Sequence, residues 1–148
     1  MEIAILALGC FWGPEIKFDK LNGVIKTEVG YCGGNSASTN YEEVCTGNTN
    51  HAEVVKIEYD SNKISYEDIL NYFFEIHDPT TLNRQGPDIG TQYRSEIFFL
   101  NTEQEDTAKV MLKKYNEKFK GNITTKISPV KNYCKAEEYH QKYLEKKF

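Results

Sequence analysis

The segment IAILALGCFWGPE, residues 3–15, sets the start of the fold. Residues 3–8 form an apolar run of strand length that stops at Gly9, and Pro14 suits the first turn of a helix. Cys10 is therefore expected at a helix N-terminus, where the helix dipole would lower the pKa of its thiol and make it reactive. The alternative is an inert core cysteine, because free cysteine is among the most buried residue types.

The composition of the 148-residue chain describes one ordinary domain, residues 1–148, able to bury ~70% of its surface. Its four cysteines show no C-x-x-C pair, which argues against a disulfide scaffold and a structural metal site. Acidic and basic residues are interspersed and the net charge is −4. Neither nucleic acid nor a membrane surface is therefore expected as a partner.

The apolar N-terminus could be mistaken for an export signal. The only charge ahead of the apolar run is Glu2, whereas export signals begin with basic residues, and the run is too short to span a bilayer. A cytoplasmic location with reduced cysteines is therefore expected.

Apolar periodicity along the rest of the chain predicts strands that alternate with helices. Ile25 and Thr27 are expected on one face of the second strand, and Thr102 opens a capping-box pattern. The order of elements predicts an α+β fold, a two-layer sandwich with helices on one face of a mixed or antiparallel sheet. The expected strands after the first cover residues 23–31, 51–59, 91–100 and 123–127, and the expected helices or helical turns cover residues 15–21, 41–47, 65–76, 102–119 and 136–144.

Two long segments lack periodicity. Residues 32–40 are mostly small and form either a flexible connector or a backbone that packs close to a ligand. Residues 77–90 are rich in proline, glycine, asparagine and aspartate, and a loop of that length is more often functional than idle. His77 is expected to cap a helix or lie on the surface, without chemistry.

Glu53 is the unusual residue of the strand 51–59. With a period of two it shares a face with Val55, Ile57 and Tyr59, which places its carboxyl group among apolar side chains. Burial without a cation would raise its pKa and keep it protonated near neutral pH, as a general acid requires. The alternatives are a hydrogen-bonded structural glutamate or one at an exposed strand end.

Six segments together resemble the motifs of the peptide methionine sulfoxide reductase A family. They follow the family order over nearly the whole chain, which makes the resemblance specific. It implies an α/β sandwich built round a ferredoxin-like plait, and reduction of the S epimer of methionine sulfoxide, free or in proteins, without a cofactor. The segments are GCFWGPE at 9–15, VGYCGG at 29–34, YEEVCTG at 41–47, HAEVV at 51–55, GTQYRS at 90–95 and AEEYHQ at 136–141.

The resemblance assigns the reacting groups. Cys10 matches the nucleophile that attacks the sulfoxide sulfur and becomes a sulfenic acid, and Glu53 matches the acid that protonates the sulfoxide oxygen. Phe11 and Trp12 match the pocket that receives the S-methyl group.

The resemblance also implies a set of groups around the sulfoxide oxygen. Tyr41 and Tyr93 match the hydroxyls that hold this oxygen. Asp88 matches an acidic residue that helps to position water and hydrogen bonds around them.

The chain departs from the family pattern in its C-terminal segment. Many members carry a resolving cysteine in a glycine-rich tail after the last motif, whereas residues 142–148 contain no cysteine. We therefore expect a 1-Cys enzyme whose sulfenic acid is reduced by an external thiol from glutaredoxin, thioredoxin or glutathione. Cys134 is the best internal alternative and Cys32 is the next. Cys45 matches a family cysteine without catalytic duty and is expected in the core.

Two other functional classes are open on the residues alone. A cysteine hydrolase would use His51 or His140 to activate Cys10 and would form acyl-enzymes. A metal-binding or interaction module would bind zinc through Cys32, Cys45 and His51. Neither class accounts for six motifs in one register.

Overall fold

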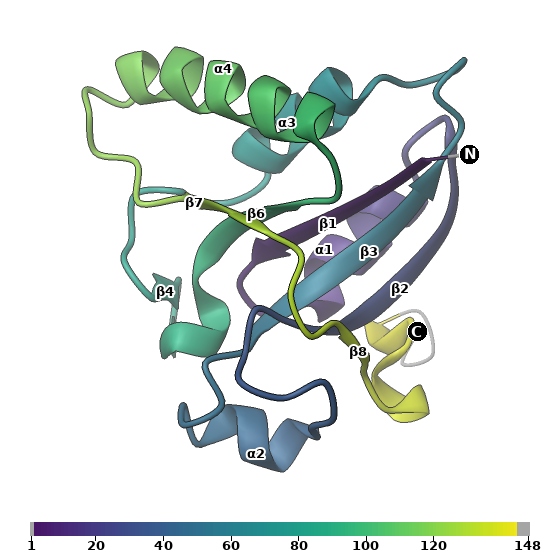
Figure 1. Ribbon diagram of the computed structural model, residues 1–148, viewed down its shortest axis with the longest axis vertical. Coiled ribbons are helices and arrows are strands. Elements are labelled where there is room, and N and C mark those ends of the chain that lie inside the picture. The colour runs from purple at the N-terminus through teal and green to yellow at the C-terminus, as the bar shows by residue number, and fades with distance from the viewer. Residues whose placement is uncertain (1, 145–148) are drawn as a thin grey trace.

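The apolar run near the N-terminus forms a central strand of a six-stranded sheet. The computed structural model describes residues 2–144. The strand order is β7-β6-β1-β3-β2-β8, so β1 lies between β3 and β6 (Figure 1). The strands are β1 (Glu2–Leu8), β2 (Val24–Cys32), β3 (Ala52–Tyr59), β6 (Ser95–Phe99), β7 (Lys126–Pro129) and β8 (Cys134–Lys135), with a separate hairpin of β4 (Arg84–Gln85) and β5 (Asp88–Ile89).

The sheet is mixed, because β6 and β7 run parallel while the other neighbours pair antiparallel. The inner order β6-β1-β3-β2, with one helix between β1 and β2 and another between β3 and β6, is a ferredoxin-like plait. The prediction of an α+β fold with a mixed sheet is confirmed.

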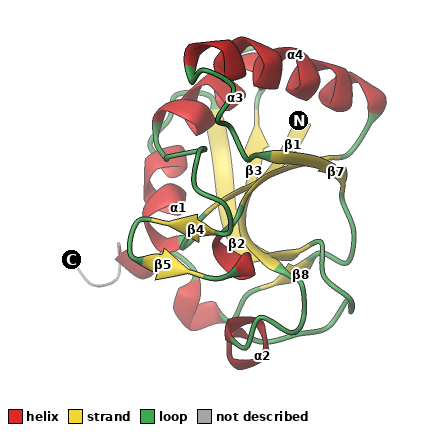
Figure 2. Cartoon of the chain, turned by 90° about the vertical axis from the view of Figure 1, so that its left-hand side faces the viewer, coloured by secondary structure: helices red, strands yellow, loops and turns green. Residues whose placement is uncertain are grey.

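Helices α1, α3 and α4 cover one face of the sheet, as Figure 2 shows. Phe18 of α1, Phe73 of α3 and Met111 of α4 belong to one buried cluster with Leu6 of β1. Burying each such side chain contributes ~1.5–3 kcal/mol. Within residues 2–144, no helix combines the length and the hydropathy that a membrane crossing requires. The helices are α1 (Trp12–Asp19), α2 (Tyr41–Cys45), α3 (Tyr66–Glu75), α4 (Thr102–Lys118) and the 3-10 helices η1 (Thr91–Tyr93) and η2 (Glu138–His140).

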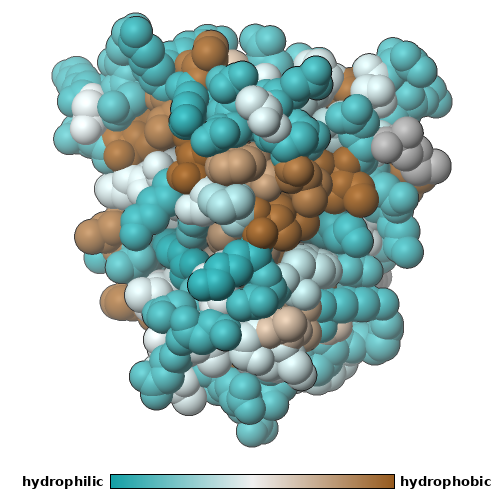
Figure 3. All heavy atoms as spheres, viewed as in Figure 1, coloured by the Kyte–Doolittle hydropathy of each residue, from teal (hydrophilic) through white to brown (hydrophobic). Residues whose placement is uncertain are grey.

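The opposite face of the sheet carries a smaller apolar cluster that includes Ile5, Cys32 and Phe98. The segment between β7 and β8 crosses in front of this face, and Val130 and Tyr133 pack against the cluster (Figure 1). Figure 3 shows hydrophobic side chains gathered across the middle of this side of the molecule. The sheet therefore separates Cys32 from the residues that face α1.

Side-chain caps fix where α3 and α4 begin. Ser65 accepts from the N–H of Asp68 at 3.0 Å and Asp68 accepts from the N–H of Ser65 at 3.3 Å, so α3 starts with a capping box. The cap predicted at Thr102 is wrong by one residue. Asn101 is the N-cap, because its side-chain oxygen accepts from the N–H of Gln104 at 2.9 Å.

His77 caps the end of α3, as predicted. Its Nδ1 lies 2.5 Å from the carbonyl oxygen of Phe73, and its Nε2 lies 2.8 Å from the hydroxyl oxygen of Ser95. Burial lowers the pKa of His77 to about 4, so the ring is neutral near pH 7. The segment 77–90 therefore leaves α3 from a fixed point.

Two strand predictions are corrected by the structure. Ile25 is 50% exposed, because a bulge near the start of β2 shifts the register against β3. Residues 91–93 are not part of a strand, since the N–H of Tyr93 donates to the carbonyl of Gly90 and the chain turns into η1. The last predicted strand, 123–127, begins later in the structure, at the start of β7.

The helix predicted over residues 136–144 is wrong. Residues 138–140 form η2, residues 141–142 form a turn, and residues 143–144 are helical, so the segment is not one continuous helix. Bonds to the sheet interrupt it. The side chain of Gln141 accepts from the N–H of Val29 at 2.9 Å and donates to the carbonyl of Val29 at 2.9 Å. Apolar periodicity carries no information about such contacts between distant segments.

Candidate active site

The predicted site residues come to one edge of the sheet. β1 ends at Leu8 opposite Ser95, the first residue of β6, and Cys10 follows after Gly9. β3 runs antiparallel to β1, so its first residues lie beside the end of β1. The topology therefore brings Cys10, Glu53 and Tyr93 to the same edge, where α2 also lies (Figure 1).

Gly9 allows the chain to turn from β1 toward α1. Its φ of +92° is in the left-handed region, and a Cβ at this position would lie 2.6 Å from the Cβ of Gln85. The β4–β5 hairpin therefore packs directly on this glycine. The side chain of Gln85 is fixed by the backbone of Asp78, with contacts of 2.9 and 2.8 Å. This packing carries Asp88, the first residue of β5, into the electrostatic surroundings of Cys10.

Cys10 lies at the N-terminus of α1, one residue before the N-cap Phe11, as predicted, but its pKa is not lowered. Burial raises the pKa of the Cys10 thiol to about 12, and the charges of Glu53 and Asp88 add to the shift. The N–H of Trp12 at the start of α1 donates to the sulfur and opposes the shift. The prediction of a lowered pKa is therefore wrong, because one N–H does not compensate for removing a thiolate from water.

Glu53 lies on the apolar face of β3, as predicted, and is 1% exposed. Its Oε1 accepts from the N–H of Phe11 at 3.2 Å, and its Oε2 has no hydrogen-bond partner among residues 2–144. Burial raises the pKa of the carboxyl to about 8, with the N–H of Phe11 opposing the shift and the charge of Asp88 adding to it. At neutral pH Glu53 is therefore mostly protonated and can donate its proton.

Phe11 and Trp12 form an apolar wall next to Cys10. Phe11 is 1% exposed and packs against Tyr31, with ring centroids 5.8 Å apart. Trp12 is partly buried and stacks on Tyr143, with centroids 3.9 Å apart and ring planes at 16°. Such a wall suits a small uncharged group better than an ion.

Tyr41 and Tyr93 enter the site from two short helices. Tyr41 is the first residue of α2, which Asn40 caps by accepting from the N–H of Glu43 at 2.9 Å. Tyr93 is the last residue of η1. Burial raises the pKa of both hydroxyls, that of Tyr93 to about 12. A hydrogen bond with Cys45 adds to the shift of Tyr41, and the charge of Glu53 adds to that of Tyr93. Both hydroxyls therefore keep their protons at neutral pH and can act as hydrogen-bond donors.

Glu137 supports the site in a way that the sequence pattern does not reveal. Its Oε1 accepts from the hydroxyl of Tyr31 at 2.9 Å, and its Oε2 accepts from the N–H of Tyr41 at 3.0 Å. Glu137 therefore ties the start of α2 to β2 and fixes the position of Tyr41. The only sequence signal for this role of Glu137 is its place in the AEEYHQ segment. The helix predicted over residues 136–144 would have directed its side chain away from Tyr31 and Tyr41.

The two histidines that a cysteine hydrolase would need have other partners. His51 holds the glycine-rich loop, because its Nδ1 accepts from the N–H of Gly34 at 3.2 Å and its Nε2 lies 2.8 Å from the carbonyl oxygen of Ser36. His140 accepts from the indole N–H of Trp12 at 3.0 Å through Nδ1. None of these bonds joins a histidine to the candidate nucleophile, so the hydrolase alternative loses its base.

All four cysteines are free. Cys32 is buried on the far face of the sheet, and Cys134 lies in β8 opposite Tyr31 of β2. Cys45, predicted in the core, is exposed, because it ends α2 and the buried residue of that helix is Val44. Among the described residues, no group of three or more His, Cys, Asp and Glu side chains could hold a metal ion. The zinc-binding alternative therefore has no site in this part of the chain.

Known proteins resemble this chain in sequence and in fold. Residues 2–148 match the family described as peptide methionine sulfoxide reductase. A protein of Pelagibacter ubique named peptide methionine sulfoxide reductase MsrA is 70% identical over 147 residues, which are 99% of this chain and 100% of that protein. The crystal structure of reduced Mxr1 from Saccharomyces cerevisiae is 40% identical, with a TM-score of 0.94 over 98% of this chain and 84% of that one. Mxr1 in complex with Trx2 is 27% identical as aligned, with a TM-score of 0.68 over 96% of this chain and 84% of that one. The chain therefore belongs to the peptide methionine sulfoxide reductase family.

Proposed function

We propose that this protein reduces the S epimer of methionine sulfoxide, free or in oxidised proteins, to methionine. The sulfur of Cys10 attacks the sulfoxide sulfur, and Glu53 gives a proton to the sulfoxide oxygen. The oxygen ends on Cys10, which becomes a sulfenic acid as methionine leaves. The observation that carries the proposal is the buried carboxyl of Glu53, which is neutral at pH 7 and has one oxygen without a partner among residues 2–144.

The groups around this pair suit the parts of the substrate. The sulfoxide oxygen gains charge as its bond to sulfur breaks, and the protonated hydroxyls of Tyr41 and Tyr93 are donors that could hold it. The wall of Phe11 and Trp12 suits the S-methyl group. Asp88, which raises the pKa of both reacting groups through its charge, would order the hydrogen bonds around them.

The charge state of the site fits acid-assisted attack. A neutral Glu53 does not repel a thiolate, so the thiolate of Cys10 can form beside it once the substrate is bound. Without a proton, the sulfoxide oxygen would have to accept a full negative charge. General acid catalysis of this kind typically supplies ~10²–10⁴-fold in rate.

The test compares Glu53→Gln with the native protein on separated S and R epimers, with dithiothreitol as reductant. Glutamine keeps the size of the side chain but cannot donate an acidic proton. We expect turnover of the S epimer to fall at least ~100-fold in the variant. Activity within about threefold of native would remove Glu53 as the acid.

A second variant separates the nucleophile from the acid. Cys10→Ser keeps the volume of the site but loses the thiolate, so S-sulfoxide reduction should be undetectable. Preference for the R epimer by the native protein, or retained activity of the serine variant, would overturn the proposed function.

Regeneration by an external thiol is the second half of the proposal. Cys32 is on the far face of the sheet, and Tyr31 lies between β8, which carries Cys134, and β3. Mxr1 of yeast has been crystallised with Trx2, so thioredoxin is the first reductant to test, followed by glutaredoxin and glutathione. Four free cysteines suit the reducing cytoplasm. No cofactor beyond the thiol enters the proposed reaction.

A further inference from the structure

Trp12 is held in place from two sides. Its indole N–H donates to Nδ1 of His140 at 3.0 Å, and the two rings are stacked with centroids 5.7 Å apart. Tyr143 stacks on Trp12 with centroids 3.9 Å apart. The polar group of the indole therefore has one partner, the imidazole of His140.

The hydrogen bond fixes the protonation of His140. An indole N–H is only a donor, so Nδ1 of His140 must be an acceptor and the ring proton must reside on Nε2. His140 is 1% exposed, and burial lowers its pKa below the ordinary value of 6.5, with the charge of Glu137 opposing the shift. The neutral ring with its proton on Nε2 is therefore the form that matches the bond, and Nε2 itself has no hydrogen-bond partner among residues 2–144.

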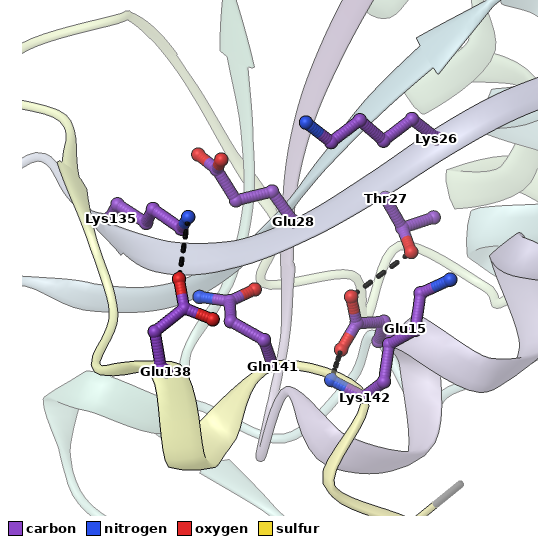
Figure 4. Close-up of a pocket in the computed structure, with 8 residues that line it drawn as sticks. All are labelled: Glu15, Lys26, Thr27, Glu28, Lys135, Glu138, Gln141 and Lys142. Carbon is purple, nitrogen blue, oxygen red and sulfur yellow. Dashed lines mark hydrogen bonds and ion pairs between the residues drawn. The ribbon is translucent and has the colours of Figure 1, made fainter.

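The segment that carries His140 is attached to the body of the protein on both sides of it. Glu137 accepts from Tyr31 and from the N–H of Tyr41. After His140, the N–H of Lys142 donates to the buried carboxyl of Glu15 in α1 at 2.6 Å, as Figure 4 shows.

The same carboxyl of Glu15 accepts from the hydroxyl of Thr27 in β2 at 3.0 Å (Figure 4). Glu15 therefore joins α1, β2 and the C-terminal segment. The imidazole of His140 is held against Trp12 by anchors that lie outside the aromatic cluster.

We propose that His140 is a positioning residue, which accepts the indole N–H of Trp12 and thereby fixes the wall of the methyl pocket. This inference rests on the proposed function for the meaning of that wall. His140 lies at the centre of the aromatic cluster, with ring centroids 5.3 Å from Phe11 and 4.6 Å from Tyr41. A displaced imidazole would therefore disturb three residues of the site together.

Protonation of His140 would break the bond. With both ring nitrogens protonated, Nδ1–H would face the indole N–H, and two donors cannot bond to each other. The titratable groups that face His140 are Glu137 and Tyr139 on its own segment and Tyr41 on α2, while α1 presents the uncharged rings of Phe11 and Trp12. Substrate binding should therefore weaken as the pH falls through the pKa of His140.

The test uses the fact that the chain contains one tryptophan. Its indole N–H gives a single signal in a proton–nitrogen correlation spectrum, which we would follow from about pH 8 to about pH 5. In the native protein this signal should shift with a midpoint below 6.5. In His140→Asn, which keeps an acceptor near the position of Nδ1 but cannot titrate, the shift should be absent. In Tyr139→Phe, which changes an exposed neighbour, it should persist.

His140→Phe keeps a ring but removes the acceptor. Its indole signal should be displaced at every pH, and KM for the S-sulfoxide should rise about tenfold with kcat within about threefold, the size of one hydrogen bond. His140→Asn should stay within about threefold of the native KM. If His140→Phe does not fold, the pH titrations of the indole signal in the native protein and in His140→Asn still test the hydrogen bond.

The spectra do not require catalysis, so the inference and the proposed function can fail separately. An indole signal that titrates in His140→Asn as it does in the native protein would overturn the bond as the origin of the shift. A normal KM in a folded His140→Phe would overturn the positioning role even if sulfoxide reduction is confirmed. An inactive native protein with the expected spectra would overturn only the proposed function.

Discussion

Burial sets the charge of Cys10 and Glu53, the two groups proposed to react in the candidate site. It raises the pKa of Cys10 to about 12 and that of Glu53 to about 8, so at neutral pH both groups carry their protons. Two neutral groups are far less costly to bury than a thiolate beside a carboxylate. In the resting site neither Cys10 nor Glu53 therefore carries a charge. We expect the thiol to react slowly until the substrate is bound.

The raised pKa of Cys10 predicts slow alkylation. Only the thiolate reacts with iodoacetamide, so the rate at Cys10 should rise about tenfold per pH unit from about pH 7 to about pH 10 without reaching a plateau. Peptide mass spectrometry assigns the modification among the four cysteines, and Cys10→Ser supplies the background. A plateau below about pH 9 would contradict the raised pKa.

The two pKa values together predict the pH profile of kcat/KM. In the proposed reaction, the active form has a thiolate at Cys10 and a proton on Glu53. Below the Glu53 pKa of about 8, the rate should rise with pH as the thiolate population grows. Above it, loss of the Glu53 proton should cancel that gain and the profile should level. In Glu53→Gln the rate should be much lower and should keep rising through this pH range. If the profile of Glu53→Gln levels at the same pH as the native profile, the levelling belongs to the titration of another group.

At the scale of single elements, local patterns predicted much of the structure. The period-two pattern of β3 placed Glu53 on the apolar face, and Ser65 marked the start of α3. The pattern could not show that the hairpin carrying Gln85 packs on Gly9, or that Gln141 bonds to β2, because these contacts join segments far apart in the sequence. The pKa of Cys10 depends on the same long-range packing, which is why the helix dipole alone gave the wrong direction.

Two glycines on either side of Cys10 should respond to alanine to different extents. Gly9→Ala would place a Cβ 2.6 Å from Gln85 at a φ of +92°, so it should lower the free energy of unfolding by ~2 kcal/mol. It should also lower kcat/KM, because the displaced hairpin carries Asp88. At Gly13 in the first turn of α1, a Cβ meets no atom within 4 Å apart from the two chain neighbours and the backbone of the helix itself. Because Pro14 disfavours the helical conformation of a residue with a Cβ before it, the usual gain of Gly→Ala in a helix is offset, and Gly13→Ala should change the free energy of unfolding by less than ~1 kcal/mol.

Urea unfolding of the two glycine variants measures both effects, and the dithiothreitol-dependent assay follows the activity. Equal stability of Gly9→Ala and Gly13→Ala would contradict the packing of the hairpin on Gly9.

At the scale of the whole molecule, the sheet determines which cysteines can meet. Tyr31 of β2 is paired with Glu53 on one side and with Cys134 on the other, so two strand spacings of ~4.8 Å each lie between the backbones of Glu53 and Cys134. Cys10 is on the Glu53 side, because the N–H of Phe11 donates to Glu53. A disulfide needs Cα atoms within ~7 Å of each other, so joining Cys10 to Cys134 would require the backbone to move.

This geometry predicts the product of one oxidation event. After a single equivalent of S-methionine sulfoxide and no reductant, Cys10 should be trapped as a sulfenic acid by dimedone, and mass mapping should find no disulfide that joins Cys10 to Cys32 or Cys134. The reason is that each candidate partner is held elsewhere: Cys32 is behind the sheet, and Cys134 is in β8. Cys134→Ser and Cys32→Ser should therefore turn over with thioredoxin as fast as the native protein. A disulfide between Cys10 and Cys134, together with loss of turnover in Cys134→Ser, would replace the external thiol by an internal one and would require β8 to leave the sheet during each cycle.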